Sequence, residues 1–133
     1  MRVLILVAMI ISLCLQVQSK GFKQKKLWVK ATGYCPCSIC CGTDSDGKTS
    51  LGKNALKPGV AADPRAIPYG TLLHIPGYDH PDLEGKHVRV DDTGGAMRQS
   101  WRKHGKYHID VRFKTHKEAL EWGVKKLQIT LLE

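Results

Sequence analysis

Three aspartates in or at the ends of short apolar segments are the residues of this sequence best suited to chemistry. Asp63 ends the segment GVAAD, Asp92 ends HVRVDD, and Asp110 lies within YHIDVRF. A carboxylic acid can give a proton to a leaving group and take one back afterwards, which is general acid–base catalysis. Aspartates in such places also cap turns, which is the structural alternative. Three of them in so small a chain favour the catalytic hypothesis.

The alternation of polar and apolar residues predicts where two of these carboxylates point. In segment 107–113 the apolar residues occupy one face of a strand, and Asp110 and Arg112 share the other. Asp110 is therefore expected to face a groove. In segment 87–93 the same period places Asp92 on the face of Val90, just before Gly94. A carboxylate there needs hydrogen bonds, which the amides of a glycine turn can supply.

The elements that must position these residues are short strands. Alternation and β-forming residues predict strands over 27–34, 59–64, 71–77, 87–93, 107–113 and 124–132. One helix is expected between the last two strands, because Thr115 and Glu118 form a capping-box pattern and Gly123 ends it. The basic stretch between Asp92 and Asp110, including 98–107, is interpreted as a loop. This pattern predicts an all-β barrel or sandwich.

The N-terminal residues predict export. A short positive start, an apolar run and a small residue at Ser19 are typical of a signal peptide over 1–19, with a retained membrane anchor as the alternative. Residues 20–26 are a basic lead-in, and 27–133 form one domain. The whole chain has a net charge of +9, which favours an anionic partner. Without a nucleic-acid-binding motif, no nucleic acid is expected as that partner.

Four cysteines are crowded into the sequence YCPCSICCG, at Cys35, Cys37, Cys40 and Cys41. In an exported chain an even number of cysteines favours disulfides, and this is the interpretation we prefer. Two bridges within so short a loop are geometrically demanding. Four thiolates could instead hold zinc, although structural zinc sites usually take their ligands from two separated pairs. Free thiols are the third alternative.

Several motifs together resemble the three-aspartate (3D) domain family. They are VAADP, DDTGGAM and YHIDVRF, with ATGYCPC and TSLG upstream and YGT between. The family name refers to aspartates that match Asp63, Asp92 and Asp110. The family is similar to the catalytic part of membrane-bound lytic transglycosylase A and to stationary-phase wall lytic enzymes. This resemblance implies a six-stranded double-psi β-barrel, with one short helix before the last strand and a substrate groove across it.

The resemblance also implies a reaction on peptidoglycan. A residue at the position of Asp110 would protonate the β-1,4 bond between N-acetylmuramic acid and N-acetylglucosamine, and then assist formation of a 1,6-anhydro product. Asp92 would raise the pKa of Asp110, and Asp63 would belong to the same catalytic network. Arg112 is expected to point along the groove toward substrate carboxylates. The implied substrate-binding residues are Thr49, Ser50, Tyr69, Thr93, Gly94, Gly95 and Arg112.

The expected partners are peptidoglycan glycan strands, with electrostatic association to anionic wall polymers. No cofactor and no metal are expected, and the protein is expected to be a secreted or wall-associated monomer. Three other functions stay open. The first is a glycoside hydrolase that uses Asp92 and Asp110 as base and acid. The second is a non-catalytic module that binds or loosens the wall, since fold does not fix function. A metal-binding regulator built on the cysteines comes third.

Overall fold

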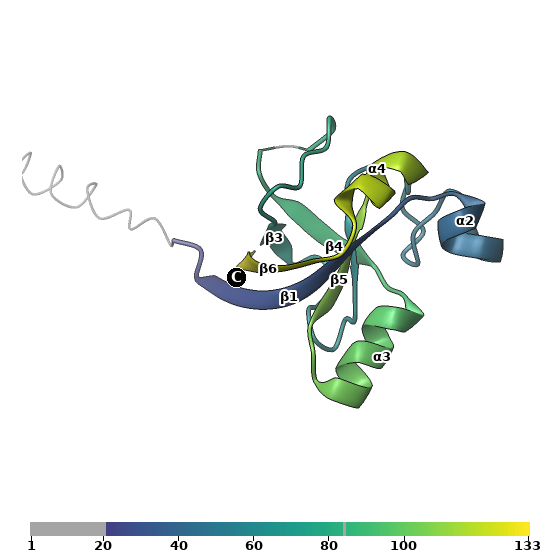
Figure 1. The fold of residues 1–133 in the computed structure, drawn as a ribbon. Coiled ribbons are helices and arrows are strands. Elements are labelled where there is room, and N and C mark those ends of the chain that lie inside the picture. The colour runs from purple at the N-terminus through teal and green to yellow at the C-terminus, as the bar shows by residue number, and fades with distance from the viewer. Residues whose placement is uncertain (1–20, 84) are drawn as a thin grey trace, which may run out of the picture.

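A computed structural model describes residues 21–133 except residue 84, so the predicted signal peptide lies outside the described residues. The described residues form six strands, as predicted, and Figure 1 shows how they are arranged. They are β1 (Gln24–Tyr34), β2 (Val60–Ala62), β3 (Leu72–His74), β4 (Val88–Asp92), β5 (His108–Arg112) and β6 (Lys125–Leu132). β1 begins at Gln24, within the stretch predicted as an unstructured lead-in, because residues 24–26 pair with the end of β6.

The strands close into a barrel in the order β1-β5-β2-β4-β3-β6, and β6 pairs with β1. The β1–β5 and β2–β4 pairs are parallel, and the other pairs are antiparallel. The register of β1 and β5 places Thr32 beside Asp110, and that of β2 and β5 places Ala61 beside Asp110. Asp110 therefore lies in the middle of a paired strand, with neighbours on both sides.

The helices are α2 (Ser38–Cys41), α3 (Gly95–His104) and α4 (His116–Trp122), with a 3-10 turn at Gly42–Asp44. The prediction of α4 is confirmed, including the capping box between Thr115 and Glu118. The expectation of only one helix was wrong, because most of the predicted basic loop is α3. No helix among the described residues is long and apolar enough to cross a bilayer.

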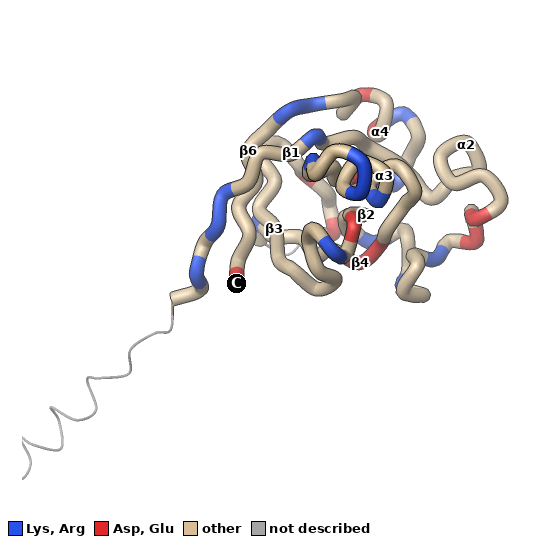
Figure 2. The backbone as a smooth tube through the Cα atoms, turned by 90° about the horizontal axis from the view of Figure 1, so that it is seen from below, with Lys and Arg blue, Asp and Glu red and all other residues tan. Residues whose placement is uncertain are grey.

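The α3 helix has a physical basis in the sequence that the loop interpretation missed. Met97 is buried, and the helix packs against β5 and β2. Gly105 ends it in the left-handed conformation (φ 59°), and its N–H donates to the carbonyl of Trp101. The basic residues of the last turn lie where the negative end of the helix dipole favours them. Figure 2 shows this positive segment beside the barrel, with acidic residues near β2 and β4.

The barrel interior is filled by the apolar faces of the strands. Val29, Ile109, Val111 and Ile129 are all at most 2% exposed. Burying each such side chain is worth about 1.5–3 kcal/mol relative to leaving it in water. The apolar face predicted for segment 107–113 is confirmed, since its apolar residues belong to this core. The core thus fixes β5, and with it the direction of the Asp110 side chain.

Strand β4 carries an irregularity at Asp91. Val60 of β2 pairs with Val90, but the next residue, Ala61, pairs with Asp92, so Asp91 is an extra residue in β4. A bulge of this kind re-aims the side chains that follow it. The expectation that Asp92 shares a face with Val90 was wrong for this reason: Asp91 and Asp92 both approach the same side chain, Arg112.

Candidate active site

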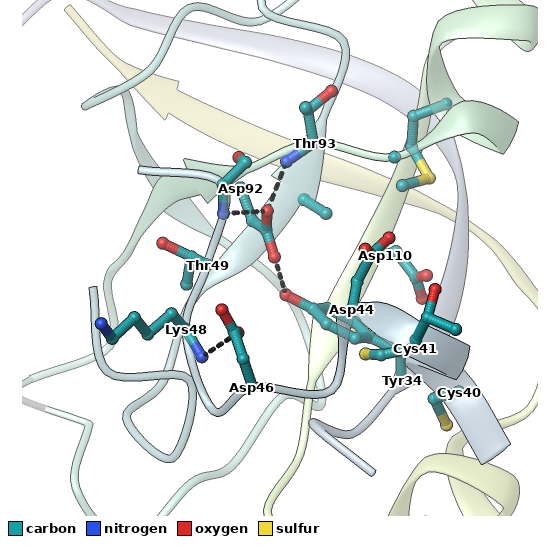
Figure 3. A pocket seen from close by; sticks show the side chains of 15 residues that line it. Tyr34, Cys40, Cys41, Asp44, Asp46, Lys48, Thr49, Asp92, Thr93 and Asp110 are labelled. Atoms are coloured by element: carbon teal, nitrogen blue, oxygen red, sulfur yellow. Dashed lines mark hydrogen bonds between the residues drawn. The ribbon is translucent and has the colours of Figure 1, made fainter. Parts of the chain in front are cut away.

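A cavity of about 480 Å³ lies against β1, β4 and β5, under the segment that contains residues 40–50 (Figure 3). Both Asp92 and Asp110 line it, and the close-up shows both side chains at this cavity. Its remaining lining residues are Tyr34, Cys40, Cys41, Thr43, Asp44, Asp46, Lys48, Thr49, Ser50, Ala61, Thr93, Gly94 and Met97. Asp92 and Asp110 thus line the same cavity, as the motifs led us to expect.

Asp110 is a partly buried carboxyl group of this cavity. Its Oδ1 accepts a hydrogen bond of 3.0 Å from Thr32 Oγ1. Burial raises the pKa of Asp110 from 3.8 to about 6, the Thr32 hydrogen bond opposes the rise, and the charge of Asp92 adds to it. A rise of this size corresponds to roughly 3 kcal/mol in favour of the protonated form. Asp110 can therefore hold a proton in mildly acidic solution.

Asp92 is held differently, by three hydrogen-bond donors. Its Oδ1 accepts from the backbone N–H of Ser50 at 2.9 Å and of Thr93 at 2.8 Å, and its Oδ2 accepts from the Tyr34 hydroxyl at 2.8 Å. These donors come from a loop, from the residue after β4 and from the end of β1. The carboxylate is thereby fixed in position, with its negative charge close enough to act on Asp110.

Arg112 does not face the cavity. It is 0% exposed, and its Nη2 donates to both oxygens of Asp91, at 2.8 and 2.6 Å. Its Nη1 donates to the Tyr34 hydroxyl at 3.1 Å and lies 3.9 Å from Asp92 Oδ2. The expectation that Arg112 points along the groove toward substrate was wrong, because the buried Asp91 carboxylate neutralises it.

The segment before β2 covers this ion pair. Arg112 Nε donates to the carbonyl of Lys57 at 2.9 Å, and the Arg112 N–H donates to the carbonyl of Gly59 at 3.1 Å. A Cβ atom at Gly59 would overlap the Arg112 guanidinium and contact Asp91. Glycine is therefore needed at this close approach. Arg112 does not line the cavity, but it contacts two residues that do, Tyr34 and Asp92.

Asp63 lies outside the cavity. It is 2% exposed, and its Oδ1 accepts from the Arg65 backbone N–H at 2.9 Å and from Arg65 Nε at 3.0 Å. The hydrogen bonds from the Arg65 side chain lower the pKa of Asp63. The hydrogen bonds of its carboxylate thus go to the turn after β2. The structure does not connect this carboxylate to Asp92 or Asp110.

The other predicted binding residues divide into two groups. Thr49, Ser50, Thr93 and Gly94 line the cavity. Tyr69 and Gly95 do not: Tyr69 lies in the exposed turn before β3, and Gly95 is the first residue of α3.

Sequence reasoning missed three residues that support the carboxylates. Tyr34 joins Asp92 to Arg112, Thr32 donates to Asp110, and His108 Nε2 lies 2.9 Å from Thr32 Oγ1. A signal was present, since Thr32 and Tyr34 are two residues apart and share one face of a strand. What the sequence did not reveal is that β1 pairs in parallel with β5 and so brings this face beside Asp110.

The four cysteines form no disulfide among the described residues. The shortest Sγ–Sγ distance, between Cys35 and Cys37, is 2.8 Å, whereas a disulfide bond measures about 2.05 Å. The structure therefore differs from the disulfide interpretation that the sequence favoured. Cys40 and Cys41 line the cavity, so the cysteine segment forms part of its wall.

A closed β-barrel with Asp92 and Asp110 in one cavity defines the class of protein, and comparisons with known proteins define the family. The profile of the 3D domain matches residues 59–133, more than half of the chain, and the chain belongs to the 3D domain family. The matched range contains Asp63, Asp92 and Asp110. The family resemblance predicted from the motifs is confirmed.

Two proteins of Bacillus subtilis (strain 168) are similar to the chain. "Putative cell wall shaping protein YabE" is 31% identical over 109 residues, which cover 81% of this chain and 23% of that protein. "Cell wall-binding protein YocH" is 30% identical over 116 residues, which cover 81% of this chain and 33% of that protein. The chain thus spans a third or less of the length of these relatives.

Proposed function

We propose that the protein is a lytic transglycosylase that cleaves peptidoglycan at the bond between N-acetylmuramic acid and N-acetylglucosamine. The observation that carries this proposal is Asp110, a carboxyl group in an open cavity whose pKa is raised to about 6. Membership of the 3D domain family and the cell-wall names of both relatives support a wall polymer as substrate.

In the proposed reaction Asp110 acts twice. As the acid it donates its proton to the glycosidic oxygen, which leaves with the bonding electrons on the N-acetylglucosamine side. The C6 hydroxyl of the muramyl sugar then forms a bond to C1 and gives its proton to the Asp110 carboxylate. No water is consumed, and the acid is regenerated. One acid–base residue suffices because the nucleophile belongs to the substrate, unlike in ordinary glycosidases with two carboxyls.

The remaining residues of the cavity have supporting roles in this proposal. Asp92 raises the proton affinity of Asp110 through its charge, and its three donors keep it from moving toward Asp110. Thr32 orients the Asp110 carboxyl group by donating to one oxygen. Tyr34 and Arg112 hold Asp92 from behind. Only Asp110 would exchange protons with the sugar.

We further infer that the barrel has the double-psi topology implied by the family resemblance. The closed order of six strands and the two parallel pairs, β1–β5 and β2–β4, are consistent with it. The basic surplus of the chain suits a wall rich in anionic polymers, and export by the N-terminal segment would bring the domain there.

A non-catalytic wall-binding module is the second candidate, and the name of YocH as a cell wall-binding protein favours it. The same cavity would then hold a glycan without cleaving it. A raised pKa at Asp110 would have no role in such a module, which is why we place catalysis first.

The test is mass spectrometry of the soluble products released from purified peptidoglycan. The chain from Lys20 onward contains all six strands and is compared with Asp110→Asn. The wild type is expected to release 1,6-anhydro-muropeptides, and the variant to release about 10²–10⁴ times less. Asp82→Asn is the matched control, since Asp82 does not line the cavity and pairs with the side chains of Lys57 and Lys114. The control should keep wild-type activity.

Two other results of the product analysis would contradict the proposal. Products with reducing muramyl ends would replace the transglycosylase by a hydrolase that uses Asp92 and Asp110. Retained binding to the wall without any soluble product would leave the binding module.

A further inference from the structure

Three cysteines and one histidine converge beside the candidate active site. Cys35 Sγ lies 2.8 Å from Cys37 Sγ and 3.4 Å from Cys40 Sγ. His116 Nδ1 lies 3.3 Å from Cys40 Sγ and 4.0 Å from Cys37 Sγ. The four possible ligand atoms all lie within 4.8 Å of one another. Packing alone gives no reason for three polar sulfur atoms and a ring nitrogen to gather at one point.

These distances suit a tetrahedral thiolate site. With Zn–S bonds of about 2.3 Å, two sulfur ligands of a tetrahedral zinc ion lie ~3.8 Å apart. The two Sγ–Sγ distances, 2.8 and 3.4 Å, are both shorter than this value, so the sulfur atoms would move apart by about 1 Å or less to surround an ion. Cys37 and Cys40 have the C-x-x-C spacing of one ligand pair, and Cys35 lies two residues before it. His116, at the start of α4, adds a ligand from a separate segment, which the cysteines alone did not do.

The fourth ligand is held in place by its own element. His116 is the first residue of α4, and the capping box of Thr115 and Glu118 fixes the start of that helix. Cys35 is buried directly after β1, whereas Cys40 is exposed, so one side of the cluster is open to an incoming ion. Cys41 is turned away: its Sγ lies 3.3 Å from the carbonyl of Cys35.

From this geometry we propose that Cys35, Cys37, Cys40 and His116 form a structural zinc site. Four protein ligands leave no position for a reacting water, so the ion would serve the fold and not the chemistry. It would tie the end of β1 to α4 and fix the segment that begins at Cys40 and forms one wall of the cavity. The zinc proposal does not rest on the proposed glycan cleavage, because its ligands include neither Asp92 nor Asp110.

The first measurement is metal content per chain by inductively coupled plasma mass spectrometry. The chain from Lys20 onward is purified without a metal-affinity tag, in wild-type form and as Cys40→Ser, His116→Ala and Cys41→Ser. One zinc ion per chain is expected for the wild type and for Cys41→Ser, the matched control outside the ligand set. Cys40→Ser and His116→Ala should lose most of the metal. Equal loss in Cys41→Ser, or a wild type without zinc, would overturn the proposal.

A second measurement does not depend on the variants folding. Metal-free wild-type protein is titrated with Co²⁺, and the visible spectrum is recorded. A tetrahedral site with three thiolates should give intense thiolate-to-metal charge transfer, and added Zn²⁺ should bleach it and raise the melting temperature. A spectrum of octahedral cobalt would contradict the proposal. So would an intact mass that shows the cysteines oxidised to disulfides while the cavity retains its activity.

Discussion

Two adjacent aspartates at the bulge of β4 have opposite surroundings. Asp91 is buried against the guanidinium of Arg112, whereas Asp92 faces the cavity and is held by neutral donors, with Asp110 as a nearby acid. Burial raises the pKa of Asp91, and its hydrogen bonds to Arg112 oppose the rise. Asp91 has a cation in direct contact and lies outside this cavity. Asp92 has open space, with its principal contacts to uncharged groups.

The difference separates a structural carboxylate from a chemical one. A buried ion pair with satisfied hydrogen bonds holds β4, β5 and the segment before β2 together. Two carboxyl groups at one cavity repel each other when both are ionised, so one of them retains a proton at higher pH. One extra residue in a strand thus places both kinds of carboxylate side by side.

Removal of Arg112, the ion-pair partner of Asp91, should cause the largest loss of stability. Arg112→Met leaves Asp91 buried without its cation, which costs about 3–5 kcal/mol of unfolding free energy. The loss should grow as pH rises, because an unpaired buried carboxylate has a raised folded-state pKa and is destabilising once ionised. Urea denaturation at several pH values measures it. The double variant Asp91→Asn/Arg112→Met should recover part of the stability, and no recovery would contradict the pairing.

The pH dependence of cleavage tests the role of Asp92 and Asp110. Cleavage by the wild type should fall as pH rises through about 6, because Asp110 loses its proton there. Asp92→Asn removes a nearby negative charge, so the pKa of Asp110 decreases and the falling limb moves to lower pH. Burial, the larger cause, remains. The pH dependence of product release measures the shift, and an unmoved limb would show that Asp92 does not act on Asp110.

The unfolding free energy of the protein should also depend on the protonation of Asp110. Because the folded-state pKa of Asp110 is raised from 3.8 to about 6, its stabilising contribution is fully present below pH 3.8 and is lost as pH rises through about 6. Asp110→Asn should remove this part of the pH dependence. Unfolding measured at both pH limits provides the comparison.

The Tyr34 hydroxyl contacts both Asp92 and Arg112, so its removal should affect stability and cleavage to an intermediate degree. Tyr34→Phe removes the hydrogen bond to Asp92 and the acceptor of Arg112 Nη1. We expect a loss of about 1–2 kcal/mol in stability together with slower cleavage, since a displaced Asp92 no longer supports the acid. Thermal unfolding and product release are measured on the same samples. Slower cleavage without any loss of stability would instead indicate direct contact of Tyr34 with substrate.

Asp63 should have the smallest effect, although it is one of the three aspartates of the family motif. Asp63→Asn keeps an oxygen for the Arg65 backbone N–H and loses the charged contact with its side chain. We expect a loss of about 1 kcal/mol or less in stability and unchanged cleavage, because an ion pair with an exposed arginine contributes little. A large loss of activity with unchanged unfolding free energy would show instead that Asp63 takes part in catalysis.

Much of this arrangement could be predicted from local patterns. Alternation and β-forming residues identified all six strands, and the Thr115–Glu118 spacing identified α4, because both signals depend on neighbours in the sequence. Helix α3 was missed because two glycines and a run of basic residues suggest a loop, although Gly105 and Met97 are typical of a helix. The pairing of Asp92 and Asp110 came from the family motifs.

The roles of Arg112 and His116 could not be predicted in this way, since both depend on non-local contacts. Alternation puts Arg112 on the face of Asp110, but only the bulge at Asp91 and the close approach of Gly59 bury it. His116 lies 76 residues or more from the cysteines, and no spacing rule connects them. A bulge adds one residue to a strand, so the alternation of side chains between the two faces is interrupted there. This explains why Asp92 was predicted on the wrong face.

The pairing of the first and last strands has a consequence for how the domain can be combined with other chains. Lys23 and Glu133 exchange two backbone hydrogen bonds, of 3.0 and 2.9 Å, so the two ends of the barrel are neighbours. A domain with adjacent ends can be appended to a longer polypeptide, or inserted into a loop of one, without opening its sheet. The relatives, of which this chain matches a third or less, fit such modular use. The same geometry makes a circular permutant, joined at these ends and opened in an exposed loop, a reasonable way to relocate the termini.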